Sequence, residues 1–320
     1  MLHGKLAVLV IGLALGAPSS GVAQDLVLAP ADKAERVADR YALVHDAGRR
    51  AVGALDVLND PRMVAADSAA AYLAALNAVR PGVQKARVDL AAIASEMRAL
   101  PPVAEQGDPG QMKGADVAAL NIARLAEQLD SVLATVDPLI DALRDGRAEE
   151  AQVLLRRLGG GSAIAIEAQG IFLRTQGDQA PPGSSEQHLR WALGCLFDGS
   201  GAYLQRGYDL IEARVAQAEI ASARRCVAEN LDAADSALDR EADPALPGGL
   251  VRQQMNAVAR RMSSTLRPME PLLAQAEADA GKQAEGAQSY FAQLAEIERR
   301  FGSLTQEQIA IMRAQPAVSR

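Results

Sequence analysis

Apolar residues recur at alternating steps of three and four along five long stretches of this 320-residue chain. Such steps average about 3.5 residues, which is the spacing of a narrow apolar seam between long, nearly antiparallel helices. No stretch shows the sustained apolar–polar alternation that is typical of strands. The pattern therefore predicts an all-α protein: an elongated antiparallel helical bundle, or bundles, of about ten helices with coiled-coil-like seams. The five stretches span residues 37–58, 83–100, 122–143, 251–276 and 287–301.

Proline, glycine and small polar residues divide the helical pattern. The Pro-Pro-Gly run at 181–183 is typical of a connector. Ser184, followed three residues later by Gln187, has the spacing of a capping box at a helix start. We therefore expect a domain boundary at this connector, with one continuous bundle as the alternative. The expected N-terminal helical bundle covers residues 24–176, and the C-terminal helical bundle covers residues 184–320.

The first 23 residues have the features of a secretory signal peptide. Lys5 precedes an apolar run over residues 6–15, and the small residues Gly21 and Ala23 stand three before and one before a cut. The apolar run is shorter than the ~20 residues that cross a bilayer. We expect cleavage near Ala23 and a mature chain in the bacterial periplasm, or secreted, with no transmembrane span. An uncleaved N-terminal anchor is the alternative.

Composition and charge narrow the classes of function. A net charge of −7 does not favour nucleic-acid binding, and three histidines and two cysteines supply few metal ligands. No phosphate-binding loop and no Gly-x-Ser-x-Gly elbow occurs in the sequence. Met255, Met262 and Met269 lie about 10.5 Å apart along a helix, too far to share a copper ion. We therefore expect no enzyme activity, no cofactor and no metal site.

Aromatic residues are scarce, at 3% of the chain, and half or more of them fall within forty residues. Glycines interleave with them at positions 194, 199, 201 and 207. A helix broken by glycine and lined with aromatic rings is one way to build a pocket for a small apolar ligand. The alternative is the well-filled core of the C-terminal half. The candidate ligand-binding residues are Phe172, Trp191, Phe197, Tyr203 and Tyr208.

A glycine-rich run follows the arginine pair Arg156-Arg157. If this run forms a turn at a helix N-terminus, its backbone N–H groups could bind an anion beside the two guanidinium groups. A simple hinge is the alternative, and the other Arg-Arg pairs are expected on salt-bridged, solvated flanks. The candidate anion site comprises Arg156, Arg157, Gly160 and Gly161.

The two cysteines are expected to pair, because lone cysteines in an oxidising compartment usually form a disulfide. Cys195 and Cys226 are 31 positions apart, about 46 Å in one unbroken helix, whereas a disulfide needs a Cα separation of about 4.4–6.8 Å. A tight hairpin turning at 199–201 would place Cys195 opposite Gln205. The disulfide is therefore expected together with a non-helical connector from Asp198 to Gly207. Two free thiols would instead favour a continuous helix through that stretch.

Two short runs resemble the Gly-Arg-Gln-Arg-Met type of signature of PilJ/NarX-like periplasmic sensor bundles. The run at 47–50 lacks the Gln and the Met, and the run at 252–255 has a different spacing to its next Arg-Met. The function expected first is an envelope binding or scaffolding protein that recognises a protein partner through helix faces. A periplasmic ligand-sensing helical bundle, with a small-molecule ligand near the aromatic residues, is the alternative.

Overall fold

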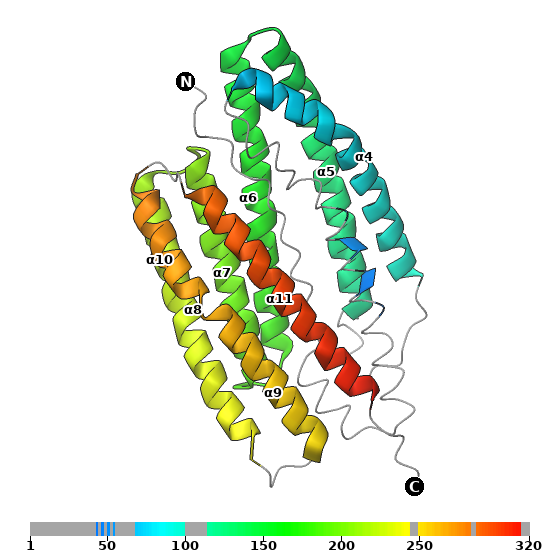
Figure 1. The fold of residues 1–320 in the computed structure, drawn as a ribbon, viewed down its shortest axis with the longest axis vertical. Coiled ribbons are helices and arrows are strands. Elements are labelled where there is room, and N and C mark those ends of the chain that lie inside the picture. The colour runs from blue at the N-terminus through cyan, green and yellow to red at the C-terminus, as the bar shows by residue number, and fades with distance from the viewer. Residues whose placement is uncertain are drawn as a thin grey trace.

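The computed structural model describes residues 68–99, 114–243, 249–282 and 286–314, together with the helical residues 43, 46, 47, 50, 51 and 54. These residues form helices and no strand, which confirms the all-α class (Figure 1). Eight helices are described in full, so the expected number of about ten stays a prediction. The signal-peptide prediction for residues 1–23 lies outside the described residues. The helices are α4 (Ala69–Arg98), α5 (Gly114–Arg144), α6 (Ala148–Gln179), α7 (Ser185–Gly207), α8 (Ala213–Glu241), α9 (Gly249–Leu266), α10 (Met269–Ala280) and α11 (Ala287–Arg313).

Serine hydroxyls cap two of the helices at their first turns. Ser68 accepts a hydrogen bond from the backbone N–H of Ala71 at 3.2 Å and begins α4. Ser184 accepts one from the backbone N–H of Gln187 at 3.2 Å, and the Gln187 side chain accepts one from the N–H of Gly183 at 2.8 Å. The predicted start of a helix at Ser184 is confirmed, and the N–H group of Gln187 is satisfied within this first turn.

Helix α7 is the central helix of the described structure. It lies between α6 and α8 (Figure 1), and 18 of its 23 residues are buried. The buried set includes polar residues at its N-terminal end as well as the apolar core residues. A helix that is buried nearly all round needs packing contacts for its apolar side chains, and hydrogen-bond partners for its polar groups, from neighbours on every side. The positions of α6 and α8 therefore depend on the surface that α7 presents.

Glycine lets α6 and α7 approach closely. Gly170 and Gly177 of α6 are seven residues apart, as are Gly194 and Gly201 of α7. A Cβ atom on Gly194 would lie 2.9 Å from the carbonyl oxygen of Gly170, and one on Gly170 would lie 2.8 Å from that of Gly194. Since any larger residue would press on a backbone atom, these two positions require glycine. The heptad spacing repeats the small positions along the seam.

Helices α7 and α8 form a hairpin whose turn covers residues 208–212. Asp209 takes the left-handed conformation there, with φ 54°. At the far end of the hairpin, the Glu241 carboxylate accepts hydrogen bonds from the Ser185 backbone N–H at 2.8 Å and from its hydroxyl at 2.7 Å. A carboxylate is favourable beside the N-terminus of α7. The hairpin is thus fixed at both ends.

The expected non-helical connector from Asp198 to Gly207 is wrong. Helix α7 continues to Gly207, and the chain reverses after it, midway between Cys195 and Cys226. A turn at that point places the two cysteines opposite each other while both helices stay intact, with a Cα separation of 6.0 Å. Gly199 is buried and packs against α8 and α10, where a Cβ would lie 2.8 Å from that of Ala223. The glycines of α7 therefore serve helix packing and do not break the helix.

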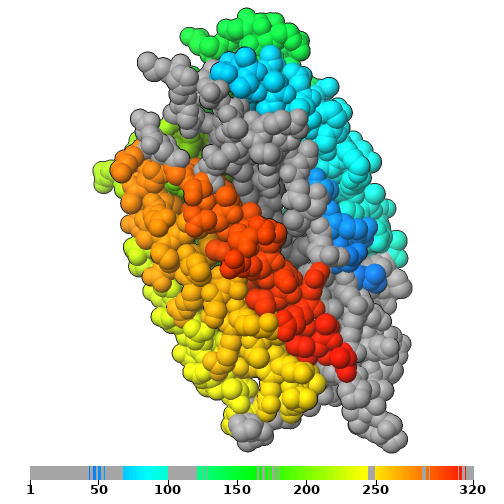
Figure 2. All heavy atoms as spheres, in the orientation of Figure 1, coloured from blue at the N-terminus to red at the C-terminus, as the bar shows by residue number. Residues whose placement is uncertain are grey.

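Ion pairs join α8 to α9 and α10 on the other side of the hairpin. Arg267, between α9 and α10, donates to Asp232 at 2.7 Å and to Asp235 at 2.6 Å. Near the turn, Arg206 of α7 donates to the carbonyl oxygens of Ala280 at 3.0 Å and Lys282 at 2.6 Å, and so caps the C-terminus of α10. Helix α11 then crosses the face of the molecule next to α9 (Figure 2).

Helix α6 belongs to two hydrophobic clusters. Its first turns, including Leu155, pack with α4 and α5, whereas Ile166 and Leu173 belong to the large core around α7. The expected division into bundles over residues 24–176 and 184–320 is not tested by this packing and stays a prediction. No helix among the described residues is long and apolar enough to cross a membrane.

Replacing Gly194 by alanine tests the close approach of α6 and α7. The new methyl group would press on the Gly170 carbonyl, so we expect G194A to lower the free energy of unfolding by about 1–3 kcal/mol. The matched control is G161A, also in a helix interior, where a Cβ would meet nothing within 4 Å. Alanine's higher helix propensity should make G161A more stable by up to about 1 kcal/mol. Urea denaturation measures the change in the free energy of unfolding of both variants. Equal changes in G194A and G161A would contradict the close packing.

Candidate functional site

The expected aromatic pocket is not assembled as a cluster of rings. Trp191, Phe197, Tyr203 and Tyr208 all lie on α7 or directly after it, spread along its length. Phe197 and Tyr203 are fully buried. Phe172 lies on α6, and its side chain is outside the described residues. The four candidates on or directly after α7 are therefore spread along one helix, and a pocket that includes Phe172 stays a prediction.

Tyr203 contributes to an aromatic layer with α11. Its ring centroid lies 5.1 Å from that of Tyr290, edge to face, and 6.4 Å from that of Phe291, stacked. The Tyr203 hydroxyl donates to Asp279, and the hydroxyls of Tyr290 and Ser200 are 2.7 Å apart. Buried tyrosines usually find such polar partners. This layer fills the interior between α7, α10 and α11.

Two other rings fit against glycines of α6. A Cβ on Gly159 would overlap the ring of Tyr208, at 2.2 Å, and one on Gly177 would lie 2.6 Å from Cδ1 of Trp191. Tyr208 is buried, and this burial raises the pKa of its hydroxyl. Trp191 is half-buried and donates from Nε1 to Asp178 at 3.0 Å. The glycines receive the rings directly, which supports the core interpretation of the aromatic set.

The expected anion site needs a glycine turn at a helix N-terminus, and the structure has no such turn there. Gly159, Gly160 and Gly161 lie inside α6, which runs without a break from Ala148 to Gln179. No helix N-terminus occurs there, so their backbone N–H groups belong to the helix and do not point at a ligand. Arg156 and Arg157 are exposed on the same helix. The expected turn is wrong because the run lies in the interior of α6, where Gly159 receives the ring of Tyr208.

Most of the other Arg-Arg pairs stand on salt-bridged flanks, as expected. The ion pairs include Arg260 with Asp239 at 2.7 Å and Arg300 with Glu296 at 2.7 Å. Arg224 pairs with Glu277 at 3.1 Å and links α8 to α10. Surface pairs of this kind contribute little to stability one by one.

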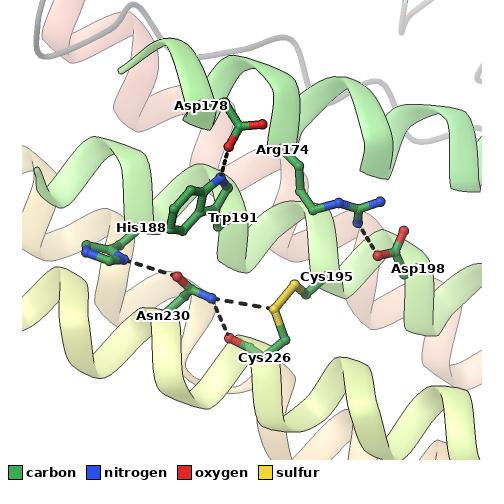
Figure 3. The surroundings of a disulfide bond; sticks show 8 residues. All are labelled: Arg174, Asp178, His188, Trp191, Cys195, Asp198, Cys226 and Asn230. Carbon is green, nitrogen blue, oxygen red and sulfur yellow. Dashed lines mark hydrogen bonds and ion pairs between the residues drawn. A yellow bond between two sulfur atoms is a disulfide. The ribbon is translucent and has the colours of Figure 1, made fainter. Parts of the chain in front are cut away.

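The Cys195–Cys226 disulfide lies within a polar, half-buried group of side chains (Figure 3). Its sulfur atoms are 1.98 Å apart. Asn230, one turn after Cys226, donates from Nδ2 to the Cys226 carbonyl at 2.9 Å and lies 3.5 Å from its sulfur. The Asn230 Oδ1 faces Nδ1 of His188 at 3.1 Å. His188 stacks edge to face on Trp191, with ring centroids 5.7 Å apart.

An ion pair continues this group along α6 and α7. Arg174 of α6 pairs with Asp198 of α7, one turn beyond Cys195 (Figure 3). Burial raises the pKa of Asp198, and the neighbouring Arg174 opposes that shift. The group thus combines a disulfide, an imidazole, an amide and an ion pair. Among the described residues, no three histidine, cysteine or carboxylate side chains come together as metal ligands.

Glu298 of α11 places a carboxylate oxygen in the interior, although the residue as a whole is half-buried. Its Oε1 atom finds no hydrogen-bond partner in the part of the chain that the structure describes. Burial raises the pKa of Glu298 to about 8. Such an acid could serve as a general acid only if it faced a substrate cleft, and it lines neither of the two hollows described next. Sequence reasoning missed Glu298, because its neighbours in sequence resemble an ordinary charged flank.

An open groove of about 560 Å³ runs along α4. The apolar part of its lining includes Ala86 and Ile93, both buried. The rim is charged: Arg50 donates two hydrogen bonds to Glu96, both at 2.9 Å, and Lys85 pairs with Asp89. The described residues that line it are Arg50, Ala54, Gly82, Lys85, Ala86, Asp89, Ala92 and Ile93.

A smaller hollow of about 250 Å³ lies between α4 and α5 and is mainly polar. Its arginines are both paired, Arg80 with Asp137 and Arg144 with Asp141. Trp191, Phe197, Tyr203 and Tyr208 line neither hollow. Sequence reasoning missed the groove on α4, because its floor combines residues near position 50 with residues near position 90. Small residues at helical spacing in α4 are the only signal of it.

Comparison with protein-family models, with curated proteins and with solved structures finds no match for this chain.

Removal of the disulfide tests its contribution to stability. A bridge that closes a loop of about this size restricts the unfolded chain and contributes about 3–4 kcal/mol. We expect the C195S/C226S double variant to keep its helical circular dichroism spectrum but to lose about that much free energy of unfolding. The packing of α7 between α6 and α8 is expected to hold the fold. Loss of the helical spectrum at 25 °C would show that the hairpin depends on the bridge.

Replacing Glu298 by glutamine tests the buried carboxylate. Burial makes the folded chain prefer the protonated form, so wild-type stability should fall as the pH rises from about 4.5 towards 8. E298Q cannot ionise, and we expect it to exceed the wild type by about 1 kcal/mol or more at pH 8, with little difference at pH 4. Thermal unfolding across this pH range measures the effect.

The matched control for E298Q is E296Q, on the same helix. A hydrogen bond from Arg300 lowers the pKa of Glu296, so E296Q should not gain stability as the pH rises. A pH-independent difference between E298Q and the wild type would contradict the burial of a neutral carboxyl group.

Proposed function

We propose that this chain is an exported binding or scaffolding protein of the bacterial envelope that recognises a protein partner through a helix face. The observation that carries the proposal is the open groove along α4, with an apolar floor and charged residues of both signs on its rim. The disulfide and the signal-peptide features of residues 1–23 support an oxidising compartment. No enzyme activity is part of the proposal.

The shape of the groove suits an amphipathic helix of the partner. Glycine and alanine dominate its floor, so a guest helix could lie close to the backbone of α4. Lys85 and Asp89, one turn apart on the rim, offer charges of both signs to the polar edges of such a helix. The expected contact is therefore helix in groove, with small apolar residues of the partner over Ala86 and charged residues beside Lys85.

The ligand-sensing alternative requires a space near the aromatic residues. Trp191 and Tyr208 pack against glycines of α6, and Tyr203 packs against Tyr290 and Phe291. The two hollows described above lie on α4 and α5. Trp191, the only tryptophan, is half-buried and reports on that region. Candidate small molecules that shift its fluorescence at micromolar concentration would favour the sensor.

Blocking the groove tests the proposed function. Ala92 lines the groove and is exposed, so A92R should obstruct a bound helix without disturbing the core. The control is V153R, at an exposed apolar position on α6. We expect one envelope protein to co-purify with the wild type and with V153R, and to be reduced at least tenfold with A92R. A photo-reactive side chain at Ala92, but not one at Val153, should cross-link to that same protein.

Two results would contradict the proposal. One is equal recovery of the same proteins with A92R and the wild type, which would exclude the groove as the docking surface. The other is recovery of the uncleaved chain in the cytoplasmic fraction, which would exclude an envelope function. Osmotic-shock fractionation and N-terminal sequencing of the mature chain measure the second.

A further inference from the structure

The two cysteines of the disulfide differ in exposure. Cys195 is 5% exposed and sits on the buried helix α7, whereas Cys226 is half-buried on α8 at the edge of the core. Residues Ser222, Arg225 and Glu229, which surround Cys226 on the outer face of α8, are exposed. A thiol arriving from solvent therefore approaches the bridge more readily from the Cys226 side than from the Cys195 side.

The Cys226 sulfur also has an oriented polar neighbour. The Asn230 amide group donates from Nδ2 to the Cys226 carbonyl and has the Cys226 sulfur within 3.5 Å of the same nitrogen. Its Oδ1 faces His188 Nδ1 at 3.1 Å, which fixes the amide so that the NH₂ group lies on the side of the sulfur (Figure 3). A disulfide sulfur is a weak acceptor, but a thiolate is a strong one. This arrangement favours negative charge on Cys226 once the bridge is open.

The hairpin does not depend on the bridge to keep the cysteines together. The Glu241 carboxylate holds the N-terminus of α7, and the turn at 208–212 holds the other end. Between them, Gly199 packs against Ala223 of α8. Opening the disulfide therefore leaves both cysteines near each other, and the bridge can re-form.

From these three observations we propose that Cys195–Cys226 is a reversible thiol–disulfide exchange site, with Cys226 as the exchanging sulfur and Cys195 as the resolving sulfur. Its substrate is a dithiol, either small or carried by a protein. This inference is independent of the groove on α4.

The exchange proceeds in two steps that balance. A thiolate of the dithiol attacks the Cys226 sulfur, forms a mixed disulfide with it, and displaces Cys195 as a thiolate that takes up a proton. The second thiolate of the dithiol then attacks the external sulfur of the mixed disulfide and releases Cys226 as a thiolate beside Asn230. The dithiol is oxidised to a disulfide, and the protein gains two electrons. In the reverse direction, the Cys226 thiolate attacks an external disulfide and Cys195 closes the bridge.

The test uses single-cysteine variants of the otherwise intact, folded chain and dithionitrobenzoate, an aromatic disulfide, as the probe. We expect the Cys226 thiol in C195S to react with it at pH 7 at least tenfold faster than the Cys195 thiol in C226S. Adding N230A to C195S should slow the reaction several-fold at pH 7 and shift its rate profile to higher pH, because the donor to the thiolate is lost. A control variant, S236A in C195S, removes a hydrogen bond to a backbone carbonyl on the same helix. It should change neither the rate at pH 7 nor the pH profile of the rate.

A companion measurement follows the native disulfide under dithiothreitol. Reduction without denaturant, with the circular dichroism spectrum retained, is expected to be complete within minutes. Reduction only at urea concentrations that unfold the chain would overturn the proposal and leave the bridge purely structural. Equal reactivity of the two single-cysteine variants, or no effect of N230A on the pH profile, would also overturn it.

Discussion

The contact between Gly194 of α7 and Gly170 of α6 sets how closely the two central helices approach, and the neighbouring elements are arranged around that distance. A single methyl group at either position would meet a backbone carbonyl oxygen within 3 Å. The close approach lets α6 cover one side of α7 while α8 covers the other. Because α7 is then buried nearly all round, its polar N-terminus must be satisfied by other elements, which explains the carboxylate of Glu241 at that end.

Much of the helical architecture was predictable from the sequence, because periodicity and capping are local properties. The start of α7 at Ser184 followed from the capping-box spacing, and the all-α class followed from the 3–4 stripes. The path between the cysteines was not predictable in the same way. The turn at 208–212 contains neither glycine nor proline, and Asp209 takes the left-handed conformation that usually marks glycine. Gly207 and Asp209 are the only usual turn residues at the reversal, and the glycines at 199 and 201 suggested a break too early in the chain.

The glycines show why the candidate sites could be predicted only in part. In a sequence, Gly159 and Gly194 favour a hinge or a break, since glycine weakens an isolated helix. In the fold, each is a helix-interior position that receives a partner: the Tyr208 ring in one case and the backbone of α6 in the other. Which group packs against each glycine depends on the tertiary structure and cannot be predicted from the local sequence. The positions of the aromatic residues in the core depend on tertiary packing in the same way. The contact between Asn230 and His188 beside Cys226 joins two helices, so neither helix shows a local sequence pattern that predicts it.

The described structure is thus a bundle whose centre is a glycine-rich helix, with its disulfide at the edge of the core and its larger hollow on a peripheral helix. The centre of α7 is the most informative region, since a continuous buried helix and a glycine-rich connector differ there in their amide protection. Hydrogen–deuterium exchange of the native chain measures that difference directly. We expect amides between Leu196 and Leu204 to exchange only through global unfolding and to be among the slowest in the protein. Rapid exchange through Gly199 and Gly201, at the rate of an open loop, would contradict it.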